Sequence, residues 1–102
     1  MPSYLVETYL ARSHPGELAA RQRRATSAAE ELTREQTPVS FKHSIHVPGD
    51  EICFFVFDAE SGPEAALAAH RAGLDPLRVV EAVSSAAPPV RPDPTKQVEG
   101  SS

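Results

Sequence analysis

Cysteine, tryptophan and glycine are scarce in this chain of 102 residues, and basic residues are not in excess. The single cysteine, Cys53, excludes a disulfide within the chain and a zinc site built from several cysteines. With 10 Lys and Arg against 14 Asp and Glu, the formal net charge is -4, so no overall positive field attracts nucleic acid. No apolar run approaches the roughly 18 residues of a membrane span, and the basic-then-apolar pattern of a secretory signal is missing. We therefore expect a soluble, cytoplasmic protein that binds neither nucleic acid nor a membrane.

Proline, in contrast, is plentiful, and the ten prolines divide the chain into segments with different patterns. Proline removes a hydrogen-bond donor and disfavours helical geometry in the residue before it, so it collects at element boundaries. Residues 17–36 are strong helix formers, and Ser61-Gly62-Pro63-Glu64 is a typical helix start with Gly73 as the matching stop. Alternating or apolar segments with β-branched and aromatic residues indicate strands. The pattern predicts strands at 3–11, 39–47, 51–57 and 77–84, and helices at 17–36 and 62–73.

The order of these elements, β-α-β-β-α-β, is that of ferredoxin-like α+β domains. Right-handed crossovers then give a four-stranded antiparallel sheet in the order 4-1-3-2, with both helices on one face. We assign residues 1–86 to this domain. Residues 87–102 are proline-rich and polar with scarcely an apolar anchor, which predicts a disordered C-terminal tail.

The third strand is apolar on both of its faces, which is unusual for a sheet with one wet face. Ile52, Phe54 and Val56 form one row, and Cys53, Phe55 and Phe57 form the other. We expect the helices to cover the first row. A second copy of the chain would then bury the second row by packing sheet to sheet, which predicts a homodimer through the open face. The tail or a bound ligand could cover this face instead.

Several side chains that bind metals fall at strand centres. Glu7 and Glu81 lie in strands that should be neighbours, and a shared cation would relieve the repulsion between their carboxylates. If Gly49-Asp50 is a two-residue turn, His46 pairs with Cys53. The simple register places Glu7, Glu81, His46 and Cys53 together on the open face. Imidazole, thiolate and carboxylate groups suit nickel, zinc or another divalent transition metal.

The same register places His43 on the opposite face of the sheet from His46. A bulge in the hairpin would reverse this assignment, so His43 and His46 both remain candidate ligands. The structural alternative is that Glu7 and Glu81 are solvated, that Cys53 is a small core residue, and that the histidines are ordinary strand residues.

These segments resemble a small bacterial family, formerly of unknown function, that has nickel-binding members of ferredoxin-like fold. The similarity runs from about residue 3 to 86 and depends on SYLVETYL, KHSIHVPGDEICFFVF, EAALAAHRAGL and RVVEAVS. Its short motifs fall here on His43-Ser44, on Cys53, and on a His-Ala-like step that is His70-Arg71 in this chain. The resemblance implies metal binding or metal response without catalysis, and it favours His43 as a ligand.

The leading hypothesis is a small dimeric metal-binding protein that buffers or senses nickel through Glu7, His43, His46, Cys53 and Glu81. The alternative is a dimeric α+β-barrel-type monooxygenase or small-molecule-binding protein. In that protein a pocket lined by Phe55, Phe57 and Tyr9 would hold the substrate, and His46 would transfer a proton. A third hypothesis is an interaction module whose sheet face docks another protein.

Overall fold

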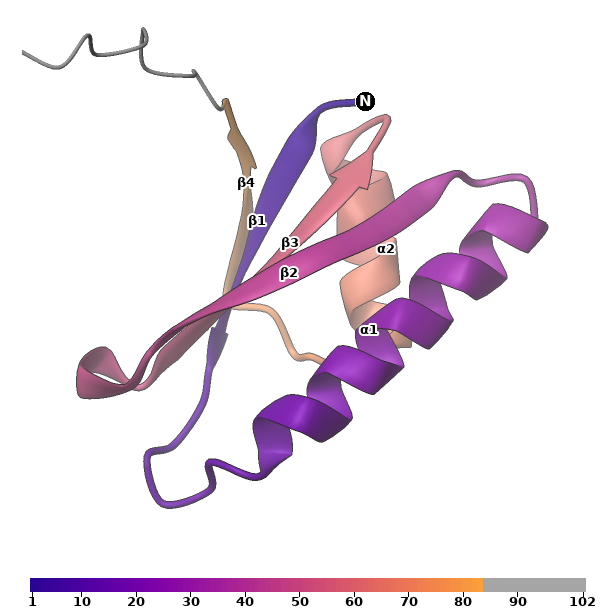
Figure 1. Ribbon diagram of the computed structural model, residues 1–102. Helices are drawn as coiled ribbons and strands as arrows, with labels where there is room; N and C mark the ends of the chain where they lie inside the picture. The colour runs from indigo at the N-terminus through magenta and orange to yellow at the C-terminus, as the bar shows by residue number, and fades with distance from the viewer. Residues whose placement is uncertain (84–102) are drawn as a thin grey trace, which may run out of the picture.

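The structure is a computed structural model that describes residues 1–83. Its elements in chain order are β1 (Ser3–Tyr9), α1 (Glu17–Arg34), β2 (Val39–Val47), the short 3-10 turn η1 (Pro48–Asp50), β3 (Ile52–Ala59), α2 (Gly62–Arg71) and β4 (Arg78–Ala82) (Figure 1). All strand pairs are antiparallel, and the sheet order is β2-β3-β1-β4. The predicted ferredoxin-like α+β fold and strand order are confirmed. The predicted domain boundary at residue 86 and the predicted tail lie outside the described residues.

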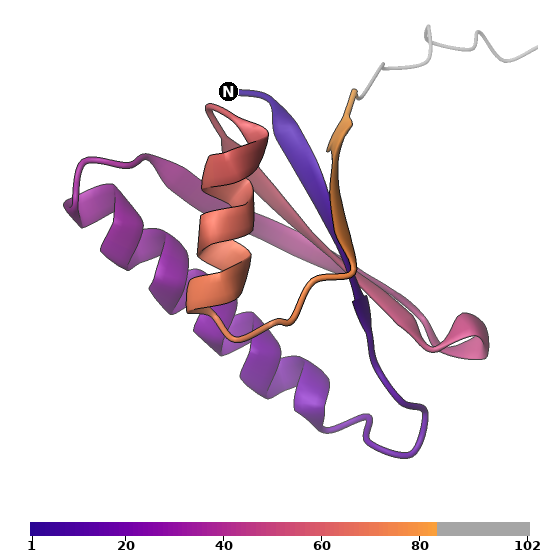
Figure 2. The ribbon, with the colours of Figure 1, turned by 180° about the vertical axis from the view of Figure 1, so that it is seen from behind.

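Both helices lie on the same side of the sheet (Figures 1 and 2). Helix α1 packs along β2, whereas α2 contacts all four strands and also α1. The helices contribute mainly alanines to the core, which lets their backbones approach the sheet closely. The fully buried large side chains come mainly from the sheet and from α1. They include Val6, Leu10, Leu32, Phe55 and Phe57.

Helix α2 begins where the sequence predicts and ends at Arg71, two residues before the predicted end at Gly73. The Glu64 N–H donates a hydrogen bond to Ser61 Oγ at 3.4 Å, so Ser61 caps the helix. At the other end Gly73 adopts a left-handed conformation with φ of 70°. Arg24 Nε of α1 donates to the Ala72 carbonyl oxygen at 2.8 Å, which satisfies one of the last carbonyl groups of α2.

The hairpin between β2 and β3 keeps the predicted register near its turn but differs in two details. The turn is the 3-10 segment η1, and Glu51 follows it with φ of 55°, yet His46 still pairs with Cys53. Farther along, a bulge at Lys42 shifts the pairing. It turns Phe41 to the helix side, where its ring lies 5.4 Å from that of Phe57. The bulge therefore places Phe41 and His43 on opposite faces of the sheet. A strict alternation along the strand had placed both residues on one face.

The prediction that Cys53, Phe55 and Phe57 lie on the open face is wrong. These three side chains are buried beneath the chain's own helices, with an exposed fraction of 0%. The cause is the register between β1 and β3, which pairs Phe55 with the buried Val6 of the helix-covered face. The outward row of β3 is Ile52, Phe54 and Val56, which is equally apolar.

Candidate functional site

The open face of the sheet is defined by the pairing of its strands, because directly opposite residues share a face. Thr8 pairs with Cys53, and both face the helices. The alternate residues therefore point away from the helices. The apolar residues of the open face include Leu5, Ile45, Val47, Ile52, Phe54, Val56 and Val80. An antiparallel sheet exposed to water normally carries polar residues at such positions, so this face has the composition of a contact surface.

The candidate metal ligands are divided between the two faces. Glu7 and His43 lie on the open face, opposite Phe54 and Val56 of β3, respectively. His46 and Cys53 lie on the helix-covered face, opposite each other as predicted. Glu81 pairs with the buried Tyr4 and so shares the helix side of the sheet, at the exposed edge strand β4. The prediction that Glu7, Glu81, His46 and Cys53 share the open face is wrong. Metal ligation by each of the five candidates stays a prediction.

The two carboxylates of the neighbouring strands β1 and β4 do not meet. Glu7 pairs with Arg78, and Arg78 Nε donates to Glu7 Oε1 at 2.7 Å. Glu81 is three residues farther along β4, so its side chain points to the other face. The carboxylates of Glu7 and Glu81 therefore do not face each other, and no shared cation is needed to offset a repulsion between them. Arg78 supplies the positive charge beside Glu7.

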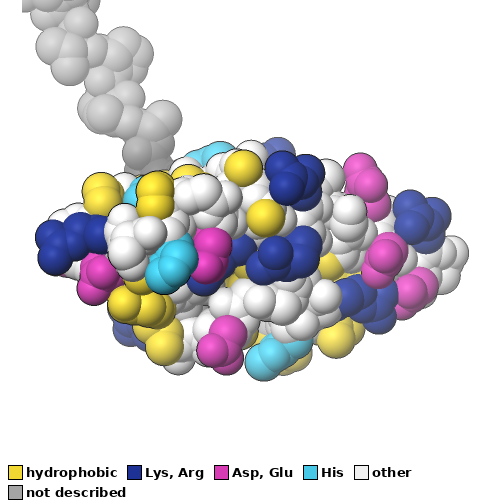
Figure 3. Space-filling view, turned by 90° about the horizontal axis from the view of Figure 1, so that it is seen from below, with side chains coloured by type: hydrophobic (Ala, Val, Ile, Leu, Met, Phe, Trp, Pro, Cys, Tyr) yellow, Lys and Arg dark blue, Asp and Glu magenta, His cyan; other side chains and the backbone are white. Residues whose placement is uncertain are grey.

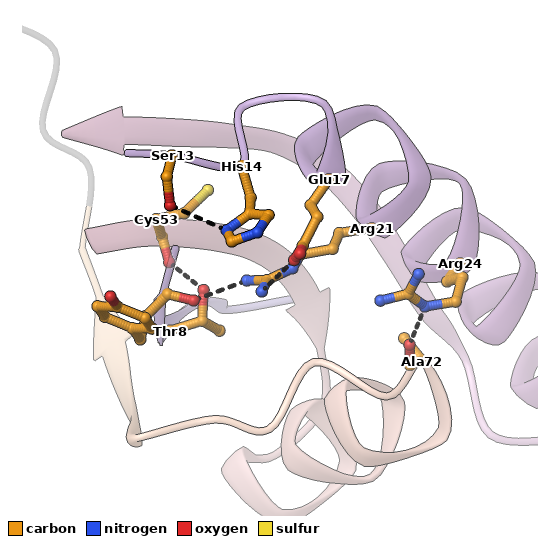
Figure 4. Close-up of polar contacts among 9 residues, drawn as sticks. Thr8, Ser13, His14, Glu17, Arg21, Arg24, Cys53 and Ala72 are labelled. Carbon is orange, nitrogen blue, oxygen red and sulfur yellow. Dashed lines mark hydrogen bonds and ion pairs between the residues drawn. The ribbon is translucent and has the colours of Figure 1, made fainter. Parts of the chain in front are cut away.

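Cys53 and His46 form a cross-strand pair beneath the helices. The Thr8 hydroxyl donates to the Cys53 carbonyl oxygen at 2.7 Å, and Arg21 of α1 donates to the Tyr9 carbonyl oxygen at 2.8 Å (Figure 4). Burial raises the pKa of the Cys53 thiol, and the charge of Arg21 opposes this rise without cancelling it. His46 Nε2 is buried and has no hydrogen-bond partner in the described part of the chain.

Within residues 1–83, no group of three or more His, Cys, Asp and Glu side chains is arranged to hold a metal ion. A transition-metal site in a protein ordinarily needs three or four ligands. A site built from the described residues would therefore have to draw its remaining ligands from a second chain or from water.

A polar cluster that the sequence analysis did not single out lies at one end of the open face. Ser3 Oγ donates to Asp58 Oδ1 at 2.6 Å, and Lys42 Nζ lies 3.7 Å from Asp58 Oδ2. These residues and His43 line a hollow of about 260 Å³ whose remaining walls are mainly apolar, including Val56. We call Ser3, Lys42, His43 and Asp58 the bulge-end cluster.

Besides His43, which was already a candidate ligand, one member of this cluster had a signal in the sequence. Asp58 continues the row Ile52, Phe54 and Val56 at a spacing of two, so it is the polar end of an otherwise apolar row. Lys42 reaches the open face only because of the bulge, and no residue pattern in β2 announces that bulge.

The pocket of the enzyme hypothesis does not form within one chain. Phe55 and Phe57 are fully buried in the core, and Tyr9 lies on the other face of the sheet with an exposed fraction of 53%. These three side chains cannot line a common cavity in a single subunit.

The charged side chains form no large area of one sign on the face that Figure 3 shows, where Lys and Arg alternate with Asp and Glu. That the chain does not bind nucleic acid stays a prediction. Among the helices of residues 1–83, none is long and apolar enough to cross a bilayer.

The fold and the apolar open face define a ferredoxin-like α+β domain with one helix-covered and one uncovered sheet face. A crystal structure of SCO4226 from Streptomyces coelicolor A3(2) is similar to this chain, with a TM-score of 0.68. The match covers 82% of this chain and 99% of the other, at 13% sequence identity. At this identity the similarity shows the fold alone. No protein-family model matches the chain, and no curated protein does.

Proposed function

We propose that the protein is a small homodimeric metal-binding protein of the cytoplasm, which buffers or senses a divalent transition metal, with nickel as the first ion to test. The observation that carries the dimer is the outward row of β3. Ile52, Phe54 and Val56 face away from the helices. Val56 is already buried within the chain, whereas Ile52 and Phe54 are partly exposed, and a second sheet would remove these two side chains from water. The proposal treats the protein as a binder without catalysis.

The place of the metal follows from where the donors lie. His43 is exposed on the open face, and Glu7 and Asp58 supply carboxylates on the same face. One chain offers too few donors for a complete site, but two faces packed together would double them. We therefore propose an ion between the subunits, with His43 as its imidazole ligand. This arrangement departs from the sequence hypothesis by leaving His46, Cys53 and Glu81 out of the site.

The test is a nickel titration of untagged protein, because a histidine tag would bind the ion itself. At nickel concentrations about 100-fold above the dissociation constant, binding adds about 2.7 kcal/mol of stability, which raises the melting temperature by several degrees. His43→Ala should lose this rise. His14→Ala is the matched control, since His14 is also exposed but lies in the loop between β1 and α1. Elemental analysis of protein purified without metal-affinity steps gives the ion and its stoichiometry.

Two results would contradict the proposal. The first is a melting temperature that does not change with nickel or zinc. The second is an equal rise in His43→Ala and in the unsubstituted protein, which would place the ion elsewhere. In sedimentation measurements, we expect the metal-bound species to have the mass of two chains.

A small-molecule-binding protein of the dimeric α+β-barrel type is the second candidate, and the size of the open-face hollow favours it. A volume of about 260 Å³ exceeds what a bare ion occupies, and Leu5, Ile45 and Val56 give the hollow apolar walls. Binding of a small aromatic compound that His43→Ala abolishes, in protein without any metal, would support this candidate over the first.

A further inference from the structure

We infer that Asp58 and His43 together form a divalent-cation site at the bulge end of the open face, and that the Lys42 ammonium is a built-in competitor for that cation. The inference deepens the proposed function and rests on it. It adds Asp58, which was not among the His, Cys and Glu ligands chosen from the sequence. It also assigns to Lys42 the role of lowering the affinity of the site for the cation.

Asp58 has the features of a fixed anionic ligand. Ser3 Oγ holds one carboxylate oxygen at 2.6 Å, which orients the group on the sheet. The Asp58 side chain is 23% exposed, so it is partly shielded from water while remaining accessible to an ion. Among the described residues, its second oxygen, Oδ2, makes an ion pair with Lys42 and no hydrogen bond.

Lys42 is held much more loosely than Asp58. Its Nζ atom lies 3.7 Å from Asp58 Oδ2, which is longer than a hydrogen bond, and its side chain is 51% exposed. A flexible, exposed lysine gains little from such a pair and can swing into solvent at small cost. A metal ion with two positive charges would therefore displace the ammonium from the carboxylate.

The bulge brings the imidazole to the same place. Lys42 is the extra residue, and His43 resumes the pairing opposite Val56, so consecutive side chains of β2 reach one hollow. Val56 and Ile45 line this hollow beside the polar groups, which lowers the local dielectric and strengthens the attraction of the carboxylate for a cation. One carboxylate and one imidazole suit zinc or nickel, and water or a second chain would supply the remaining ligands.

The charges favour a cation over an organic acid as the ligand. The negative group is partly buried and is held by a hydrogen bond from Ser3, whereas the positive group is exposed and lies beyond hydrogen-bond distance of the carboxylate. A ligand that replaces the exposed group therefore carries positive charge, as the lysine does.

The experiment measures nickel affinity by calorimetry on the untagged full chain and three variants. Lys42→Met should bind nickel roughly three- to tenfold more tightly, because the competing pair and the repulsion between two cations are both removed. Lys42→Arg is the matched control, which keeps the charge and should stay within about twofold of the unsubstituted protein. Asp58→Asn should weaken binding at least roughly tenfold, since it removes the charged ligand. Zinc provides a parallel series.

The outcomes separate this inference from the proposed function. If the protein binds nickel through His43 but Lys42→Met and Asp58→Asn leave the affinity unchanged, the inference is overturned and the proposed function stands. If neither the unsubstituted protein nor Lys42→Met binds nickel or zinc, both fail. Thermal melting of each variant without metal verifies that it folds, so a weakened affinity reports on the site.

Discussion

At the scale of single residues, Cys53 illustrates how burial decides chemical behaviour. A lone cysteine next to a histidine could be a metal ligand, a nucleophile or a core residue. In this fold it is fully buried beneath the helices, and burial raises the pKa of its thiol. The neutral thiol therefore acts as a small apolar side chain of the core.

We expect iodoacetamide to label Cys53 in the native protein at least roughly tenfold more slowly than in the denatured chain, because the reagent needs an exposed thiolate. Mass spectrometry of timed samples measures both rates. Cys53 is the only cysteine, so the labelled mass is unambiguous. Rapid stoichiometric labelling under native conditions would show that the thiol is accessible.

The raised pKa also sets the direction of a pH effect. A group whose pKa is higher in the folded state stabilises the fold at pH values below its ordinary pKa, and this contribution disappears as the pH rises through the folded value. We therefore expect the free energy of unfolding to fall in alkaline solution, above the ordinary pKa of 9.0 for a thiol. Cys53→Ala should remove this part of the pH dependence in urea titrations.

At the scale of elements, the ends of α2 and the bulge of β2 position the rest of the molecule. The helix ends were predictable because Ser61 and Gly73 are residues with specific capping geometry. The bulge at Lys42 was not predictable, because its cause is the fit between strands. It is nevertheless the feature that assembles the bulge-end cluster.

Gly73→Ala should destabilise the fold by about 1 kcal/mol, since Gly73 adopts a φ of 70° that alanine resists. Urea denaturation followed by circular dichroism measures the change. Gly49→Ala is the matched control, because a Cβ there meets nothing within 4 Å and Gly49 does not have a left-handed φ. We expect Gly49→Ala to stay within about 0.5 kcal/mol. Equal losses at the two positions would contradict the role of the backbone conformation.

At the scale of the whole molecule, the main feature is the sheet face that the helices leave uncovered. The helices cover one side of the sheet, and an apolar surface crosses all four strands on the other. Charged residues such as Glu7, Arg78 and Lys42 lie among these apolar side chains. This composition resembles that of a subunit interface.

We expect Phe54→Lys to shift the protein toward monomers without unfolding it, because Phe54 lies in the outward row of β3 and belongs to the uncovered face. Sedimentation velocity at several protein concentrations measures the association, and far-ultraviolet circular dichroism verifies the fold. Leu67→Lys is the matched control, since Leu67 is an exposed apolar residue on α2. A monomeric unsubstituted protein at high micromolar concentration would contradict the dimer.

The sequence by itself determined the order of elements, the strand order and the residues at which both helices begin, because proline, glycine, capping residues and hydrophobic periodicity act locally. It also determined that His46 faces Cys53, since the short hairpin fixes that register. The tertiary structure alone decided which row of β3 meets the helices. Periodicity separates two rows but does not rank them, and a shift of one residue between β1 and β3 exchanges the two faces. For that reason the five candidate metal ligands chosen from the sequence are divided between the two faces of the sheet.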